Sequence, residues 1–350
     1  DVRLPPIIDS RMVLQRDIPI PVWGWAGPGE EITVSFAGKK QMTAADSEGC
    51  WKVKFPPMDA GGPFEMIIQG DNYIGLADIY VGEVWLCSGQ SNMERELRRV
   101  EKGVKEAKSA DYPLIRLFNI DREESGRPVR DADAYWRICD DYTSVRNFSA
   151  VGYFFGKKIH RELNVPVGLI HAAWGGTPIE TWTPPAGFES NPKLKLITQE
   201  IKEANGRYNR RVRRSIDRIE AWVKEARKAV QQNVSAPVPP DTPGHPLDNH
   251  DEPTSLYNGM IHPVIPYAIR GAIWYQGEEN RGDGMLYYEK MKALISGWRK
   301  VWNQGTFPFY YVQLAPFRYD GDPYALPEIW EAQTKALSIP QTGMAVTVDI

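Results

Sequence analysis

The sequence has few cysteines and no long apolar run. Of its 350 residues three are cysteine, and Cys50, Cys87 and Cys139 show neither the even number of a disulfide framework nor the Cys-x-x-Cys spacing of a metal site. No apolar stretch approaches the roughly 20 residues of a membrane-spanning helix. The residues from Asp1 to Pro6 do not resemble a signal peptide. We therefore expect no disulfide framework and no membrane span.

An excess of basic residues is also missing. The formal net charge is −3 and the sequence pI is about 6.1. Lysine and arginine gather only between Arg207 and Lys228, where the solvated face of a helix accounts for them. We therefore expect no nucleic acid partner. The sequence does contain 12 Trp and 16 Tyr, which serve both sugar-binding clefts and cores.

The length predicts two domains, because 350 residues exceed the usual size of one hydrophobic core. In the first part, short β-rich runs alternate with Gly/Pro turns, which predicts an antiparallel β-sandwich module over residues 1–78. The runs are Ile20–Trp25, Ile32–Phe36, Trp51–Phe55 and Phe64–Ile68. We expect Trp23, Trp25 and Trp51 in the core of this module, with an exposed carbohydrate platform as the alternative.

From Ile79 onward, strands alternate with helical patterns, which predicts a three-layer α/β/α domain over residues 79–350. The expected strands are Val81–Cys87, Ile115–Asn119, Val167–Ala172, Gly271–Tyr275, Phe309–Gln313 and Met344–Asp349. Helices are expected at Val151–Leu163, after the Trp174 loop, and at Leu286–Val301. Residues 184–253 form an insertion, with a charged helix over Leu194–Gln232 and a proline-rich loop after it. The apolar stripe of that helix, from Ile216 to Val230, is expected to pack on the main domain.

The pentapeptide Gly89-Gln90-Ser91-Asn92-Met93 directly follows the strand that ends near Cys87. A serine on a tight turn after a buried strand is exposed to a substrate carbonyl, as in acyl-transfer enzymes. Ser91 is therefore our candidate nucleophile. The alternative is an ordinary turn at the end of a strand, because Gly, Ser and Asn are common turn residues.

Two later loops supply candidate donors to the oxyanion that forms in acyl transfer. In Trp174-Gly175-Gly176-Thr177-Pro178-Ile179-Glu180, the paired glycines let backbone N–H groups approach a ligand, and we choose Gly176. In Trp274-Tyr275-Gln276-Gly277-Glu278-Glu279-Asn280, Gln276 has a side-chain amide to donate. The Ser91 N–H is the third donor. All three loops follow strands, at the sheet edge where open α/β folds bind ligands.

These three blocks, in this order, resemble those of the sialate O-acetylesterase family, which belongs to the SGNH-hydrolase carbohydrate esterases. The resemblance extends to Val81–Trp85, to Leu256–Pro263 and to the N-terminal β module. It implies a flavodoxin-like α/β/α fold, Ser91 as nucleophile, and Gly176 and Gln276 in the oxyanion hole. It also implies removal of acetyl groups from sugar hydroxyls, such as those of sialic acid or a polysaccharide, without metal or organic cofactor.

The base of this family is a histidine in an Asp-x-x-His block, shortly beyond a strand that resembles Met344–Ile350. The given sequence stops at Ile350, so we expect the catalytic His and Asp outside it, in the rest of a longer chain or in a companion fragment. The alternative is a catalytically impaired glycan-binding protein on an esterase scaffold. The family also implies an extracytoplasmic location, with the leader outside the sequence.

Other polar residues have weaker claims to a role. His171 is expected to be a structural residue bonded to the backbone, and His262 is expected to line the site, with a role as the base as the alternative for either. The cluster His245, Asp248, His250 and Asp251 has the ligand types of a divalent-metal site, and a metal-dependent hydrolase is therefore a third hypothesis. Glu278 is expected to hydrogen-bond to the backbone of the Ser91 loop, with the orientation of a histidine as the alternative, and Asn92 is expected to support the same turn. Arg95 is expected to pair with Glu94 or Glu96, with an anionic substrate as the alternative.

Overall fold

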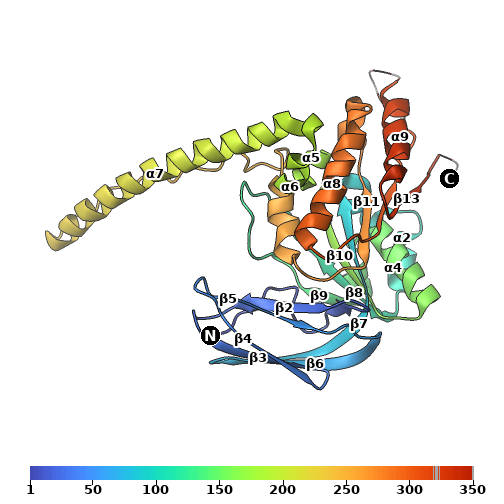
Figure 1. Ribbon diagram of the computed structural model, residues 1–350, viewed down its shortest axis with the longest axis horizontal. Coiled ribbons are helices and arrows are strands. Elements are labelled where there is room, and N and C mark those ends of the chain that lie inside the picture. The colour runs from blue at the N-terminus through green and yellow to red at the C-terminus, as the bar shows by residue number, and fades with distance from the viewer. Residues whose placement is uncertain (318, 320–321, 323, 349–350) are drawn as a thin grey trace.

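A mainly parallel sheet forms the centre of the molecule. The computed structural model describes residues 1–317, 319, 322 and 324–348 (Figure 1). Across the sheet the strands follow the order β13-β12-β11-β7-β10-β8-β9, and each neighbouring pair is parallel except β8 and β9. Their bounds are β7 Tyr73–Gly89, β8 Tyr112–Asn119, β9 Trp136–Cys139, β10 Val167–Ala173, β11 Gly271–Tyr275, β12 Phe309–Val312 and β13 Thr342–Ala345. The predicted α/β class is confirmed.

The strand order differs from the flavodoxin-like order in one place. That order would put the first parallel strand next to the second, whereas here the third strand, β10, lies between β7 and β8. Every residue of β10 is buried, and it pairs with a strand on each side. In β8 only Ile115–Phe118 are buried. Because a central parallel strand is covered on both faces, the more apolar strand takes the inner position.

Helices cover both faces of this sheet (Figure 1). On one face, Trp85, Cys87 and Leu169 share a core with α2 (Gly103–Lys108) and α4 (Ala150–Leu163). On the other face, Leu86 and Ile170 share a core with α5 (Ile179–Trp182), α8 (Leu286–Trp302) and α9 (Ala325–Lys335). The shorter helices are α1 Ser91–Glu94, α3 Tyr142–Val145 and α6 Pro185–Glu189. The helices predicted at 151–163 and 286–301 are therefore confirmed to within one residue.

The N-terminal part is built mainly from antiparallel pairs, with its first strand, β1, as the exception because it pairs with β7 in parallel. Its strands are β1 Val13–Gln15, β2 Ile20–Trp25, β3 Glu31–Phe36, β4 Lys39–Ala44, β5 Cys50–Phe55 and β6 Gly61–Gln69. Strand β2 pairs with β5, whereas β3 pairs with β4 and β6. Trp23 and Trp51 are only 9% and 3% exposed, and both belong to the apolar core. This burial excludes them as an exposed carbohydrate platform.

Strand β7 belongs to both parts of the molecule. Its first residues pair antiparallel with β6, from Tyr73 opposite Gln69, and its last residues pair parallel with β10 and β11. The predicted boundary between residues 78 and 79 lies within this strand. Between the two halves, the buried carboxylate of Glu83 binds Arg16 at 2.6 Å and Arg270 at 2.8 Å.

The insertion contains a long helix that projects from the rest of the molecule (Figure 1). Helix α7 spans Lys195–Gln231, and Figure 1 shows it extending away from the rest of the molecule. The prediction that its apolar stripe packs on the main domain is wrong: Ile216 and Val230 are 48% and 67% exposed. Only its first turns join a core, through Ile201 and Ala204. No helix among the described residues is both long and apolar enough to cross a membrane.

The last strand is shorter than predicted. It spans Thr342–Ala345 rather than Met344–Asp349, and Val346–Val348 lie outside any strand. Asp349 and Ile350 lie outside the described residues. Strand β13 nevertheless pairs with β12 in parallel, as the alternation of strands and helices predicts.

Candidate active site

The Ser91 turn connects the end of β7 to α1. Gly89 has a φ of +146°, and a Cβ there would lie 2.2 Å from the carbonyl oxygen of Tyr275. Only glycine fits this approach. The next N–H, that of Gln90, donates to the same carbonyl at 3.0 Å. Ser91 then begins α1 with an exposed side chain, and its hydroxyl makes no hydrogen bond within the described part of the chain.

The glycine loop after β10 lies against this serine. Trp174 N–H donates to the Gly89 carbonyl at 3.2 Å, which fixes the start of the loop. A Cβ on Gly175 would lie 3.2 Å from Ser91 Cβ. Gly176 is exposed, has a φ of +78°, and its N–H has no acceptor among the residues that the structure describes. The structure thus brings Ser91 and the predicted glycine loop together.

Glu94 connects helix α1 to the glycine loop after β10. From the sequence, Glu94 was expected only as a partner for Arg95. Its carboxylate accepts a hydrogen bond from Gly175 N–H at 2.9 Å and another from Arg122 Nε at 2.8 Å. Glu94 stands three residues after Ser91 and so shares its helical turn. The spacing of three residues could have predicted this contact. Side chains three apart lie on the same face of a helix, so the Glu94 carboxylate faces the loop that packs on Ser91.

Gln276 is not free to act as the predicted oxyanion donor. Its side chain is 0% exposed. The amide Nε2 donates to the Thr177 carbonyl at 3.1 Å and to Asn280 Oδ1 at 2.7 Å, while its oxygen accepts from Tyr287 at 2.8 Å. Both amide hydrogens are therefore engaged inside the protein. Gln276 follows directly after β11 with its side chain in the core, and its hydrogen bond to the Thr177 carbonyl supports the glycine loop from inside the protein.

Glu278 contacts the Ser91 turn through the side chain of Asn92, and not through the backbone as had been expected. Asn92 Nδ2 donates to Glu278 Oε1 at 2.6 Å, which connects α1 to the loop after β11. Burial raises the pKa of Glu278, and the hydrogen bond from Asn92 opposes that rise. The second oxygen, Oε2, is buried without a hydrogen-bond partner among the described residues. One acceptor at this edge of the sheet is therefore left unused.

A polar pocket of about 260 Å³ opens beside Ser91. Its lining contains three arginines and two glutamates: Arg95, Arg99, Arg122, Glu94 and Glu96. Glu96 pairs with Arg99 at 2.6 Å, whereas the exposed Arg95 donates only to the Arg99 carbonyl, at 3.3 Å. The expected ion pair of Arg95 with a neighbouring glutamate is therefore not formed within the described residues.

His171 and His262 bind partners other than Ser91. His171 is buried, its Nδ1 lies 2.6 Å from Asn119 Oδ1, and burial lowers its pKa to about 4. His262 Nδ1 lies 2.7 Å from the Val129 carbonyl. Neither forms a hydrogen bond with Ser91 in the described part of the chain. The Nδ1 of His171 contacts a side chain rather than the expected backbone. His262 does not line the pocket that contains Ser91.

The two histidines of the proline-rich loop are bound to different partners. His245 Nε2 lies 3.2 Å from Asn205 Oδ1, whereas the His250 ring stacks on Trp174 with centroids 5.0 Å apart. Within the described residues, no three His, Cys, Asp or Glu side chains converge to hold a metal ion. The geometry therefore gives the metal-dependent hypothesis no support.

Comparison with known proteins identifies the family. Residues 81–214 and 214–350 match the family model described as carbohydrate esterase, sialic acid-specific acetylesterase. The chain belongs to this family. It is therefore a member of a family of ester hydrolases, as the order of its three sequence blocks predicts.

The relatives of this esterase chain are longer than the chain itself. Sialate O-acetylesterase of Rattus norvegicus is 31% identical over 98% of this chain and 67% of its own length. The human sialate O-acetylesterase is 28% identical over 98% of this chain and 64% of its own. A carbohydrate acetylesterase from Xanthomonas citri superposes with a TM-score of 0.79 and 33% identity, covering 100% of this chain and 69% of that structure. The chain thus spans about two thirds of these relatives.

Proposed function

We propose that this protein is a carbohydrate O-acetylesterase with Ser91 as its nucleophile. One observation carries the proposal: the exposed, unbonded hydroxyl of Ser91 lies beside a glycine loop whose Gly176 N–H is also unbonded within the described residues. A nucleophile and a free backbone donor at one sheet edge are what acyl transfer needs. The helices on both faces and the position of Ser91 at a strand end also support an SGNH-hydrolase fold.

The reaction takes place in two displacements. Ser91 Oγ attacks the acetyl carbonyl carbon and gives its proton to the base, while the Ser91 and Gly176 N–H groups bind the oxyanion. The bond to the sugar oxygen then breaks, and that oxygen takes the proton. Water attacks the acetyl-serine in the same way, the base accepts its proton, and acetate leaves as Ser91 regains a hydrogen. In this proposal Gln276 positions the glycine loop and donates nothing to the substrate.

For the base, the proposal relies on the family resemblance. That resemblance implies a histidine in an Asp-x-x-His block as the base. The unused Oε2 of Glu278 lies at the same edge of the sheet. The proposed substrate is an O-acetylated sugar, in line with relatives that are a sialate O-acetylesterase and a carbohydrate acetylesterase. An extracytoplasmic location remains part of the proposal.

Acetate release tests this function. The full-length protein should hydrolyse 4-nitrophenyl acetate and an acetylated sugar, and Ser91→Ala should lower kcat by roughly 10⁴-fold or more. Ser47→Ala, an exposed serine of the N-terminal part, is the matched control and should keep full activity. Unchanged turnover in Ser91→Ala would refute the assignment. Binding of acetylated sugar without turnover in the wild-type protein would instead favour a glycan-binding protein.

A further inference from the structure

The far part of α7 is accessible along much of its length. The helix contains 37 residues and is therefore about 55 Å long. Beyond its first turns, its contacts come from the chain that returns along it: Trp222 donates to the Pro237 carbonyl at 2.7 Å, and Ser215 donates to the Asp241 carbonyl at 3.1 Å. We call α7 and this returning segment, residues 232–243, the arm.

The arm is strongly basic in an otherwise acidic chain. Helix α7 contains eleven Lys and Arg and five Asp and Glu, whereas the whole chain has a formal net charge of −3. Arg207, Arg211, Arg214 and Arg218 recur every three or four residues, so one cation appears in each turn of about 5.4 Å. Within the described residues, Arg211, Arg214 and Arg218 have no carboxylate at ion-pair distance, unlike Arg207, which pairs with Glu203 at 3.8 Å.

Simple solvation does not account for this pattern. A solvated helix face usually alternates its charges, so that Glu and Lys or Arg pair four residues apart. Here positive charge accumulates unbalanced at a spacing of one turn, which costs self-repulsion in the absence of a ligand. A regular row of unpaired cations suits a polymer that carries regular negative charge.

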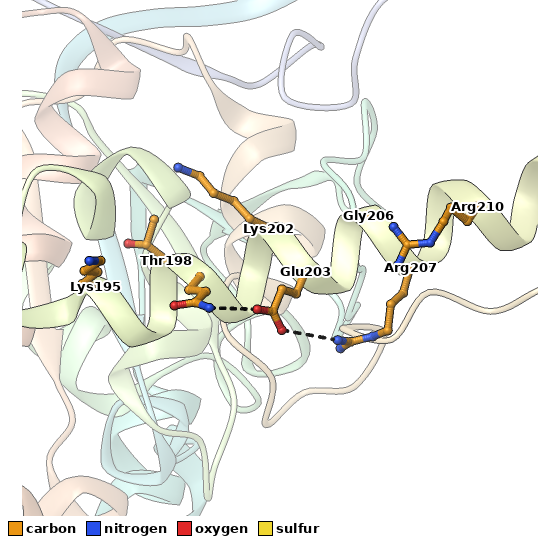
Figure 2. A pocket seen from close by; sticks show the side chains of 8 residues that line it. Lys195, Thr198, Lys202, Glu203, Gly206, Arg207 and Arg210 are labelled. Carbon is orange, nitrogen blue, oxygen red and sulfur yellow. Dashed lines mark hydrogen bonds and ion pairs between the residues drawn. The ribbon is translucent and has the colours of Figure 1, made fainter.

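The basic side chains of the arm line two hollows that follow each other along the helix. Figure 2 shows the first, of about 640 Å³, with Lys195, Lys202, Arg207 and Arg210 along one side of α7 and Glu203 among them. The second, of about 560 Å³, lies between α7 and the returning segment. It is lined by Arg211, Arg214 and Arg218, with Asp217, Asp241, Thr242 and Pro243.

A short segment connects the arm to the pocket at Ser91, with an arginine at each end and Glu123 and Glu124 between them. Arg122 lines that pocket and lies 5.1 Å from the centre of the Trp174 ring. Five residues later, Arg127 lies 4.6 Å from the centre of the Tyr208 ring on α7 and donates a hydrogen bond to Asn209. The segment between Arg122 and Arg127 therefore runs from the candidate active site to the base of the arm.

We propose that the arm binds a carboxylated polysaccharide whose acetyl groups are presented to Ser91. This inference rests on the proposed esterase function and adds a class of substrate and a second binding surface to it. The aromatic rings of the arm favour a polysaccharide over single-stranded nucleic acid, which stacks its bases on free ring faces. Tyr208 is covered by Arg127 and His245, and Trp222 is bound to the returning segment.

Binding measurements on the full-length Ser91→Ala protein test this proposal without turnover. The probes are polygalacturonate, neutral hydroxyethyl cellulose and a single-stranded DNA, titrated by calorimetry at 50, 150 and 500 mM NaCl. Polygalacturonate should bind, and its affinity should fall steeply with salt because exposed charges are screened. Arg211→Glu with Arg214→Glu should weaken this binding at least 10-fold. Lys39→Glu with Lys40→Glu on β4, an equal change of charge at exposed positions, should change it less than 2-fold.

Three outcomes would overturn the proposal. They are equal binding of polygalacturonate and the neutral polymer, equal binding of polygalacturonate by the arm variant and the β4 control, and tighter binding of DNA than of polygalacturonate. Equal melting temperatures of the two double variants show that folding is not the cause of a difference. A lack of acetate release from the wild-type protein would refute the esterase and leave the binding result standing, so the two failures are distinguishable.

Discussion

The carboxylate of Glu94 accepts a hydrogen bond from the backbone N–H of Gly175 at 2.9 Å. Together with the hydrogen bond from Trp174 N–H to the Gly89 carbonyl, this contact holds the loop that contains Gly176 against the helix that begins at Ser91. Because the two candidate donors to the oxyanion, the N–H groups of Ser91 and Gly176, lie on opposite sides of this contact, Glu94 is a positioning residue for the proposed reaction.

Replacing Glu94 should therefore lower turnover more than stability. We expect Glu94→Ala to lower kcat about 10-fold or more, because a small displacement of oxyanion donors is costly. Glu94→Gln keeps an oxygen acceptor for Gly175 and should recover part of the loss. Glu96→Ala is the control, since Glu96 lines the same pocket and binds Arg98 and Arg99 instead. Equal kcat values for Glu94→Ala and Glu96→Ala would contradict this role.

Gln276→Ala separates a buried support from a direct donor. It removes three side-chain hydrogen bonds at a fully buried position, so we expect a loss of about 2 kcal/mol or more in the free energy of unfolding together with lower kcat. A direct oxyanion donor would instead lose about 10²-fold in kcat at unchanged stability. Urea unfolding measured beside acetate release distinguishes the two, and the second pattern would restore the role predicted from the sequence.

Gly89→Ala should prevent the Ser91 turn from forming. The new Cβ would meet the Tyr275 carbonyl at 2.2 Å in addition to the strain of a positive φ. We expect a loss of about 3 kcal/mol or more in the free energy of unfolding. Gly29→Ala is the matched control, because Gly29 also has a positive φ, of +79°, but open space around it. Similar losses in the two variants, measured by urea unfolding, would show that the contact with Tyr275 is unimportant.

His171 should make the protein less stable in acid. Its pKa in the folded protein is about 4, below its ordinary value of 6.5, so the unfolded chain binds the proton more readily. Above pH 6.5 His171 is neutral in both the folded and the unfolded protein, so it does not lower the free energy of unfolding. As the pH falls from 6.5 through 4, protonation of the unfolded chain lowers the free energy of unfolding by about 3 kcal/mol in total.

Urea unfolding at pH 7 and at pH 4.5 checks this expectation against His171→Gln, which cannot titrate in this range. The stability of the wild-type protein should fall more than that of the variant as the pH is lowered. An NMR titration of the His171 ring with a pKa near 6.5 would contradict the explanation by burial.

Local patterns in the sequence predicted most of the parallel strands, the helices α4 and α8, and several N-terminal strands, but not how far every strand extends. Strand β11 has the bounds that the sequence predicts, Gly271–Tyr275, because a short apolar run between a glycine and a polar loop allows few alternatives. The length of β7 was underestimated, because its first eight residues belong to the antiparallel part of the molecule. Only their pairing with β6 shows that they and the parallel part form one strand. Strand β9 was missed because Trp136–Cys139 is too short to show a period.

For the site, a motif predicted the residues but not which way their side chains point. Ser91, Gly176 and the pair of Asn92 with Glu278 lie where the loops after the strands predicted. Gln276 does not, because the direction of a side chain just beyond a strand depends on what packs there, here Tyr287 of α8. The arm likewise has the amphipathic pattern of a packed helix, and no local signal shows that the core ends before Ile216.

The sharing of β7 between two sheets has a consequence for how the protein is divided. Units that evolution recombines are usually separated by an exposed linker, and here residues 73–89 are one unbroken strand that ends beside the candidate nucleophile. Glu83 reinforces the middle of this strand from both sides through Arg16 and Arg270. The N-terminal part therefore shares a continuous strand with the sheet that positions the Ser91 turn. Separating the two parts of the molecule would divide that strand.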